Sequence, residues 1–208
     1  LNPWNLDGLE EIENDFGKKI YNILQLRLHP SIIELKKEIE AKKVEKKYEI
    51  DLTYITSRGN WYFTSWKGDE SKSGGIATNI GVHFYDMLMW IFGKVQLNIV
   101  HHREANSASG FLELENARVR WFLSVDDTTL PEEVSSAGQR TYRSITIDGK
   151  EIEFSGGFTD LHTLSFQDIL DGNGFGLQEA RPSIEVVHHI RNADVVMQRD
   201  FLHPFMNK

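Results

Sequence analysis

Three polar residues recur at helical spacing in the segment SGGIATNIGVHFYD (73–86). Asn79, His83 and Asp86 stand four and three residues apart, so a helix places them on nearly one face, with apolar residues between them for the core. A histidine aimed into a cleft can act as a general base near neutral pH, oriented by a carboxylate, while an amide binds a substrate hydroxyl. The alternative is a buried histidine that only pairs with the carboxylate, and spacing alone leaves both open.

The segment before this helix, residues 57–74, predicts a long loop rich in glycine, serine, tryptophan and charge. Loops of this length are more often functional than passive. Cations beside aromatic rings suit a ligand that carries both a phosphate and a ring. The candidates for binding such a ligand are Arg58, Asn60, Trp61, Tyr62 and Lys67. The alternative is a solvated loop whose tryptophans dock on the core.

Periodicity predicts the elements that must position these residues. Helices are expected at 5–16, 31–43, 75–92, 160–172 and 179–198, the last with Pro182 near its start. Strands are expected at 20–28, 47–56, 95–103, 107–115, 118–125, 143–149 and 150–155. The pair Asp148-Gly149 favours a hairpin between the last two. Grouped strands with separate helices indicate an α+β fold with an open, largely antiparallel sheet covered on one face by helices.

Composition narrows the function. The chain has 208 residues, enough for one large domain or two small ones. Of these residues 40% are hydrophobic and 26% charged, which is ordinary for a soluble globular chain. A net charge of −8 argues against a nucleic-acid partner, and the absence of cysteine excludes disulfides and thiolate zinc sites. The chain contains no run of 18 apolar residues, so the sequence predicts no membrane-spanning helix.

The two adjacent histidine pairs, 101–102 and 188–189, do not form natural metal sites. Adjacent side chains point apart on a strand or a helix, so no metal is expected. DGNGFG (171–176) follows a helical pattern, the wrong context for a dinucleotide turn.

Three segments carry a resemblance to a known family: SGGIATNIGVHFYDMLMWIFG (73–93), YITSRGNWYFTSWKGDESKSGG (54–75) and DGNGFGLQEARPSIEVVHHIR (171–191). They resemble the glucose–fructose oxidoreductase / inositol dehydrogenase (Gfo/Idh/MocA) family, in its branch of UDP-N-acetylglucosaminuronic acid 3-dehydrogenases of lipopolysaccharide O-antigen synthesis. The resemblance implies an N-terminal Rossmann domain that binds NAD and a C-terminal domain that binds the UDP-sugar and forms a homo-oligomer, a dimer or tetramer, through its sheet. Residues 1–208 are then the C-terminal domain. The Rossmann domain and a Glu-Lys-Pro motif are expected before LNPWNLD.

The resemblance also implies roles for single residues. His83 falls on the family's catalytic histidine, and Asn79 falls where many members carry Asp, so we expect it to hydrogen-bond the substrate. Arg58, Asn60, Trp61, Tyr62 and Lys67 fall in the substrate-binding loop. Arg27 follows the early strand, at a region that faces the substrate, and His162 falls near the cleft on the cofactor side.

The implied reaction is oxidation of the sugar C3 hydroxyl in the cytoplasm, with hydride passing to NAD, which 2-oxoglutarate can regenerate. We expect these 208 residues alone to be inactive. The alternative function is a stand-alone sugar-nucleotide binding or assembly module without catalysis.

Overall fold

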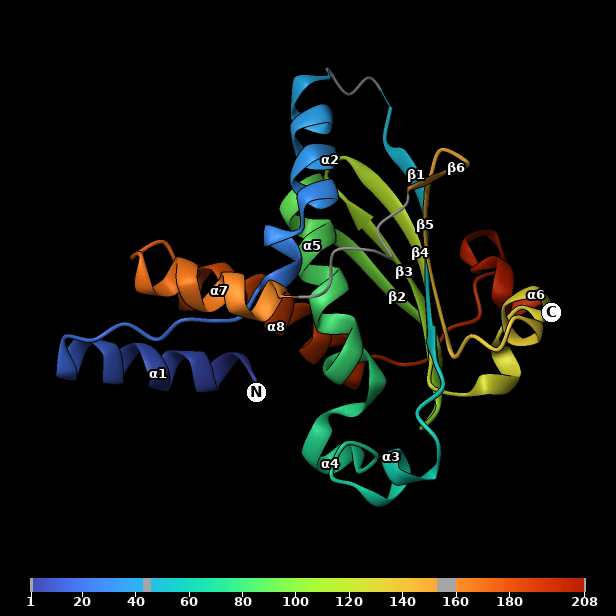
Figure 1. Ribbon diagram of the computed structural model, residues 1–208, viewed down its shortest axis with the longest axis horizontal. Coiled ribbons are helices and arrows are strands. Elements are labelled where there is room, and N and C mark those ends of the chain that lie inside the picture. Colours follow the sequence, from blue (N-terminus) through green and yellow to red (C-terminus); the bar gives the residue numbers. More distant parts are fainter. Residues whose placement is uncertain (1, 43–45, 153–159, 208) are drawn as a thin grey trace.

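The computed structural model describes residues 2–42, 46–152 and 160–207, and shows one sheet with its longer helices gathered mainly on one side (Figure 1). The strands are β1 (Tyr48–Thr56), β2 (Val95–Arg103), β3 (Ser107–Leu114), β4 (Ala117–Ser124), β5 (Thr141–Ile147) and β6 (Lys150–Ile152). The longer helices are α1 (Pro3–Phe16), α2 (Pro30–Ala41), α5 (Val82–Phe92), α7 (Leu161–Leu170) and α8 (Leu177–Asn192). Shorter helices are α3 (Asn60–Thr64), α4 (Glu70–Ser73) and α6 (Glu132–Ser136), with 3₁₀ turns η1 (Gln25–Leu28), η3 (Asp127–Thr129), η4 (Arg199–Phe201) and η5 (Pro204–Asn207).

The sheet has the strand order β2-β3-β4-β1-β5-β6. Every neighbouring pair is antiparallel except β1 and β4, which run parallel because the chain crosses from β1 through α5 before it returns to the sheet. The predicted open, largely antiparallel sheet is therefore confirmed. None of the helices in the described part of the chain is long and apolar enough to cross a membrane.

The helical face of the sheet forms the core, with α2, α5 and α8 on that side (Figure 1). Alternate residues of β1 point into it, and Leu52 is fully buried. Helix α5 packs its own apolar stripe on the sheet: the Tyr85 ring lies 5.4 Å from Trp121, and the Phe84 ring lies 5.0 Å from Tyr54. This packing fixes the rotation of α5 about its axis, and hence the direction of its polar residues.

The C-terminal segment after α8 crosses to the opposite face of the sheet (Figure 1). Phe201 stacks on Phe111 with ring centroids 4.3 Å apart, and Phe205 lies 5.5 Å from Phe122. His203 lies between these contacts, with its Nε2 atom 3.2 Å from the hydroxyl of Thr53. Burial, aided by the charge of Arg120, lowers the pKa of His203 to about 3. The second face is thus partly covered by an aromatic segment, although only the first carries the long helices.

The strand predicted at 20–28 is wrong. Asn22 forms a single antiparallel bridge with Phe175, and residues 25–28 turn into η1. Leu24 and Leu26 are buried individually against the helices, so the apolar pattern is satisfied without a ladder. Apolar alternation favours a strand only where a second strand supplies hydrogen-bond partners, and the described residues offer this segment one bridge.

Other expected elements form with local differences. The loop at 57–74 contains α3 and α4, and the helix expected at 75–92 includes a π-helical turn, η2 (Ala77–Gly81), before α5. Pro182 lies inside α8 rather than in its first turn. The β5–β6 hairpin forms as predicted, because Asp148 and Gly149 both adopt positive φ angles, 49° and 78°, as a two-residue type I′ turn requires. Residues 153–155 of the last predicted strand lie outside the described residues.

Candidate active site

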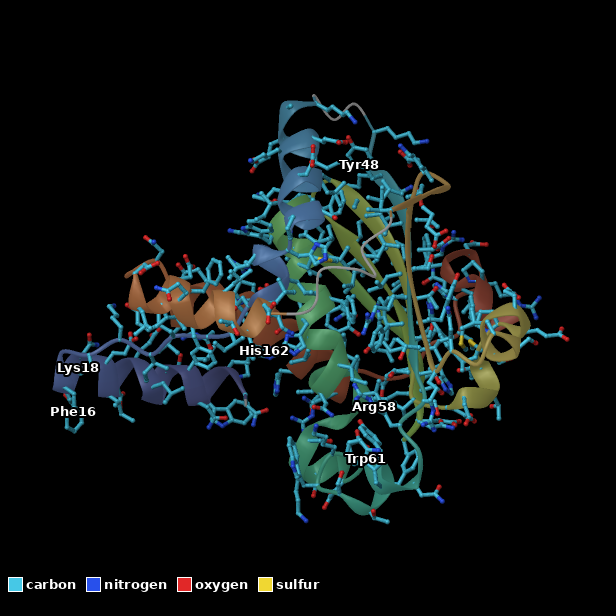
Figure 2. All side chains as sticks on the ribbon, in the orientation of Figure 1. Phe16, Lys18, Tyr48, Arg58, Trp61 and His162 are labelled. Carbon is cyan, nitrogen blue, oxygen red and sulfur yellow. The ribbon has the colours of Figure 1, made fainter. Side chains whose placement is uncertain are left out.

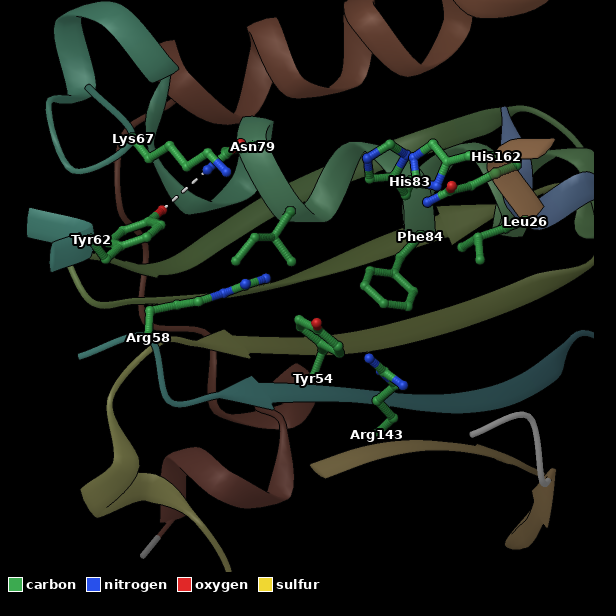
Figure 3. Close-up of a pocket in the computed structure, with 12 residues that line it drawn as sticks. Leu26, Tyr54, Arg58, Tyr62, Lys67, Asn79, His83, Phe84, Arg143 and His162 are labelled. Carbon is green, nitrogen blue, oxygen red and sulfur yellow. Dashed lines mark hydrogen bonds between the residues drawn. The ribbon is translucent and has the colours of Figure 1, made fainter. Parts of the chain in front are cut away.

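A cavity of about 410 Å³ opens between the helical layer and the sheet (Figure 3). Its size is within the usual range for small-molecule sites. The helical wall comes from η2, α5 and α7, the sheet wall from β1 and β5, and one end from the segment that leads through α3. The lining residues are Gln25, Leu26, Tyr54, Arg58, Tyr62, Lys67, Asn79, Ile80, His83, Phe84, Arg143 and His162.

Two glycines and a π-helical turn position Asn79. Gly74 and Gly75 have φ angles of +78° and +77°, which only glycine adopts readily, and a Cβ on Gly74 would lie 2.7 Å from the hydroxyl oxygen of Thr78. The chain can therefore reverse sharply into η2, a kind of turn frequent at functional sites. From this turn the Asn79 amide donates to the Tyr62 hydroxyl over 3.4 Å. The pair joins the helix to the loop at one end of the cavity.

His83 and His162 lie beside each other at the other end of the cavity (Figure 3). His162 is in the first turn of α7, which follows Asp160 in a left-handed conformation with φ 70°. Burial lowers the pKa of His83, and the nearby charge of His162 lowers it further. His83 is therefore neutral at pH 7 and can accept a proton, as a general base must.

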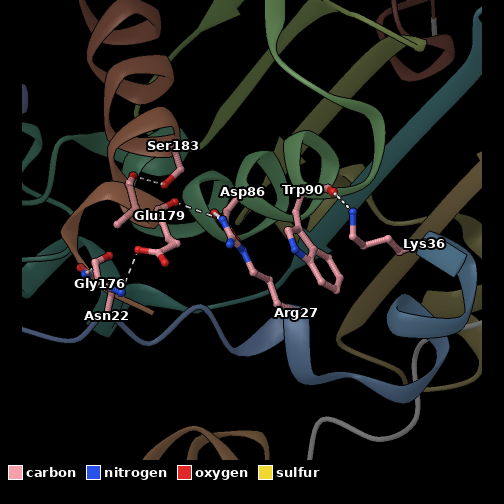
Figure 4. A network of polar contacts seen from close by, with 9 residues as sticks. Asn22, Arg27, Lys36, Asp86, Trp90, Gly176, Glu179 and Ser183 are labelled. Carbon is pink, nitrogen blue, oxygen red and sulfur yellow. Dashed lines mark hydrogen bonds and ion pairs between the residues drawn. The ribbon is translucent and has the colours of Figure 1, made fainter. Parts of the chain in front are cut away.

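Asp86 does not share the face of Asn79 and His83. Its carboxylate accepts two hydrogen bonds from Arg27, of 2.7 and 2.9 Å, on the side of α5 that faces η1 and α8 (Figure 4). Arg27 also donates to the carbonyl of Glu179 and lies over the Phe175 ring at 5.1 Å. The sequence-based expectation that Asp86 orients His83 is wrong, because the arginine of a distant segment occupies both carboxylate oxygens.

Three cations reach the cavity, Arg58 and Lys67 from the segment after β1 and Arg143 from β5, while no Asp or Glu is among its described lining residues. The Nε atom of Arg58 is buried and makes no hydrogen bond within the described residues. Lys67 places its ammonium 5.7 Å from the Trp61 ring and 5.9 Å from the Trp66 ring. Arg143 lies over Tyr54, with its guanidinium carbon 5.4 Å from the ring centroid. In a chain of net charge −8, this concentration of positive charge indicates an anionic ligand.

The structure brings six of the nine predicted site residues to one cavity: Arg58, Tyr62, Lys67, Asn79, His83 and His162. Asn60 and Trp61 lie outside the lining. Asn60 is exposed at the start of α3, and Trp61 is 52% exposed beside the cavity (Figure 2). Arg27 is also outside the lining, held by Asp86. Whether each of these residues binds a ligand stays a prediction.

Arg143 and Tyr54 complete the sheet wall of the cavity, and Arg143 was not among the residues predicted from sequence. A usable signal for Arg143 was present in its strand. It shares the parity of Ile145 and Ile147, both of which are buried, so it stands on the apolar face of β5. A charged residue on the buried face of a strand is uncommon and indicates a partner or a ligand.

An α+β domain that presents a neutral histidine and several cations to one cavity is of the kind that binds an anionic small molecule. The sequence profile of the oxidoreductase family C-terminal alpha/beta domain (GFO_IDH_MocA_C) matches residues 36–130. The WlbA (WbpB) dehydrogenase from Thermus thermophilus, in complex with NAD and alpha-ketoglutarate, is 48% identical over 99% of this chain, with a TM-score of 0.94. Its complex with NAD and UDP-GlcNAcA gives 47% identity over 98% of this chain and a TM-score of 0.92. The chain belongs to the Gfo/Idh/MocA oxidoreductase family, and the described fold is that of its C-terminal domain.

The chain spans 66% and 65% of those two relatives. The WlbA dehydrogenase from Bordetella pertussis, in complex with NADH and UDP-GlcNAcA, is 16% identical over 91% of this chain and 66% of its own, with a TM-score of 0.68. At that identity the likeness shows the fold alone. The fold is thus retained while most of the sequence changes.

Proposed function

We propose that this chain is the substrate-binding and oligomerisation domain of an NAD-dependent dehydrogenase that oxidises C3 of UDP-N-acetylglucosaminuronate in lipopolysaccharide biosynthesis. The single observation that carries the proposal is the cavity, where His83 lies with Arg58, Lys67 and Arg143 and no described carboxylate. The 47% identity to a dehydrogenase in complex with NAD and UDP-GlcNAcA supports this substrate. A sugar-nucleotide substrate also supports a cytoplasmic location.

In the proposed reaction His83 takes the proton of the C3 hydroxyl, because its lowered pKa keeps it neutral and ready to accept one. Asn79, held by Tyr62, hydrogen-bonds a sugar hydroxyl and keeps the ring in place. The cations bind the negative charges of the sugar nucleotide. NAD, when bound, supplies the hydride acceptor.

We place the nicotinamide of the cofactor at the histidine end of this cavity. His162 is exposed at that end, where it can contact a cofactor presented from outside these residues. The dinucleotide itself requires a glycine-rich phosphate turn between a strand and a helix, and DGNGFG instead follows α7. We therefore propose that NAD is held mainly by an N-terminal Rossmann domain outside these 208 residues, as the coverage of the relatives supports.

Association with a second copy is proposed through the sheet face opposite the long helices. There the C-terminal segment leaves a charged strip, in which Arg120 pairs with Asp51 at 2.6 Å and Arg118 with Glu49 at 3.6 Å. Side chains of Arg118 and Glu49 remain about half exposed, so they can pair with a neighbour. Light scattering should find a dimer or tetramer, and a strict monomer would contradict this part of the proposal.

The catalytic part is tested in the full-length protein with NAD and UDP-N-acetylglucosaminuronate. His83→Ala should lower kcat by about 10²–10⁴-fold, the usual contribution of a general base. The matched control is His189→Ala on the exposed side of α8, which should leave turnover unchanged. Near wild-type turnover of His83→Ala would remove its role, and binding without turnover in the wild type would favour the non-catalytic binding module.

A further inference from the structure

We propose that Arg143 selects sugar nucleotides that carry a carboxylate, by binding that group at the sheet wall of the cavity. The inference rests on the proposed function and adds a residue that decides specificity. It also divides the cavity into two anion-binding regions. Arg58 and Lys67, which belong to the segment after β1, form the first region, and Arg143 on β5 forms the second.

The fold holds Arg143 in a fixed place. Arg143 and Tyr54 are direct partners across the antiparallel β5–β1 pair, so their side chains stand on the same face of the sheet. The guanidinium carbon lies 5.4 Å from the Tyr54 ring centroid, and that ring in turn packs on Phe84 at 5.0 Å. A guanidinium stacked on a buried ring keeps its planar donors in a fixed orientation beside that ring, and Arg143 presents this group at the wall of the cavity.

The two regions lie apart along the cavity (Figure 3). Lys67 lies with Tyr62 and Asn79 at the end that the tryptophan-bearing loop forms, whereas Arg143 lies on the sheet wall below Phe84, toward the histidine end. The positive charge is therefore distributed over the length of a ligand rather than gathered around one group.

A UDP-uronic acid has its negative charge in the matching two places. The diphosphate is attached at C1 of the sugar, and the carboxylate extends from C5. With the C3 hydroxyl at His83, a diphosphate at Lys67 and Arg58 directs the rest of the ring toward Arg143. Arginine forms two parallel hydrogen bonds with a carboxylate, which a neutral hydroxymethyl group at the same carbon cannot match. Arg143 would thus distinguish the acid from its neutral parent sugar nucleotide.

The test compares dissociation constants in the full-length protein for UDP-GlcNAcA, for the neutral UDP-GlcNAc and for UDP, measured by calorimetry. Arg143→Gln should weaken the acid about 10–100-fold, as expected for loss of a charged hydrogen-bonding pair, and change the other two less than about threefold. Arg143→Lys keeps the charge but loses the paired donors, and should fall between. The control is Arg140→Gln, at an exposed position outside the cavity lining.

Unchanged binding of UDP shows that the two Arg143 variants are folded, so a loss confined to the acid is specific. An equal loss for acid and neutral sugar would overturn the assignment, as would an acid-selective loss in Arg58→Gln with none in Arg143→Gln. Failure of the proposed function gives a separate result: the wild type binds the acid, Arg143→Gln weakens it, and no NADH forms. If the wild type binds none of the three nucleotides, both proposals fall.

Discussion

Two sets of arginines lie on either side of α5, and they have opposite surroundings. Arg27 meets a carboxylate that the protein itself supplies, and its side chain and that of Asp86 are only 10% and 3% exposed. Arg58 and Arg143 face a cavity whose described lining contains no Asp or Glu. The same residue type thus connects η1 to α5 in one place and, in the other, lines a cavity that we propose receives an anionic ligand.

The comparison also explains why the Arg27 region is closed. The Arg27 guanidinium donates to Asp86 and to the Glu179 carbonyl (Figure 4). It also lies near the Phe175 and Trp90 rings. Burial raises the pKa of the Asp86 carboxyl, and the adjacent guanidinium opposes that rise. A buried pair of this kind fixes geometry well, but it depends strongly on both partners being present.

The largest effect on stability is expected from Arg27→Met, which leaves the Asp86 carboxylate buried without its cation. The free energy of unfolding should fall by about 3–5 kcal/mol in urea denaturation. The double variant Arg27→Met/Asp86→Leu should recover most of this loss, because no charge is then left unpaired. A loss below about 1 kcal/mol in the single variant would mean that the two regions do not differ as described.

The opposite pattern is expected from Arg58→Gln. On the proposal that this side chain binds a ligand and not another part of the protein, the unfolding free energy should stay within about 0.5 kcal/mol of the wild type. The affinity for UDP in the full-length protein should fall about 10–100-fold, measured by calorimetry against Arg140→Gln as control. A destabilised variant with unchanged affinity would assign Arg58 to the structural group with Arg27.

The smallest effect concerns the histidine end of the cavity, where His162→Asn removes one charge facing His83. Burial remains the main cause of the lowered His83 pKa, so that pKa should rise only part of the way toward its usual value. The fall of kcat/KM on acidification should then begin at a higher pH, because His83 is protonated earlier. Arg58, Lys67 and Arg143 still face the cavity and oppose the rise. An acid limb that stays in place or moves to lower pH would show that His162 does not influence His83.

Much of the sheet could be predicted because its signals are local. The strand at 47–56 and the Asp148-Gly149 turn depend on neighbouring residues only, and both form as expected. The burial of β1 does not alternate throughout, because residues 52–56 are buried on both faces, and on the second face His203 of the C-terminal segment contacts Thr53. The strand expected at 20–28 failed because its pattern says nothing about whether a pairing strand exists. Leu24 and Leu26 are buried even though the segment has no pairing strand among the described residues.

The site was partly predictable for the same reason. Asn79 and His83 are one helical turn apart, so one face was expected to carry both, and both line the cavity. Asp86 was misplaced because three residues beyond His83 the helix has rotated, by enough to meet Arg27 from a segment 59 positions away. The spacing of the residues around Asp86 does not indicate that Arg27 is its partner.

The sequence by itself determined a helix that carries Asn79 and His83, and a preceding segment with Arg58 and Lys67. These follow from spacing and composition within short segments. Only the tertiary structure decided that Arg143 stands beside Tyr54 and that His162 reaches His83. Those contacts depend on the order of strands in the sheet and on the packing of α7, which arise from the burial of the whole core rather than from any one segment.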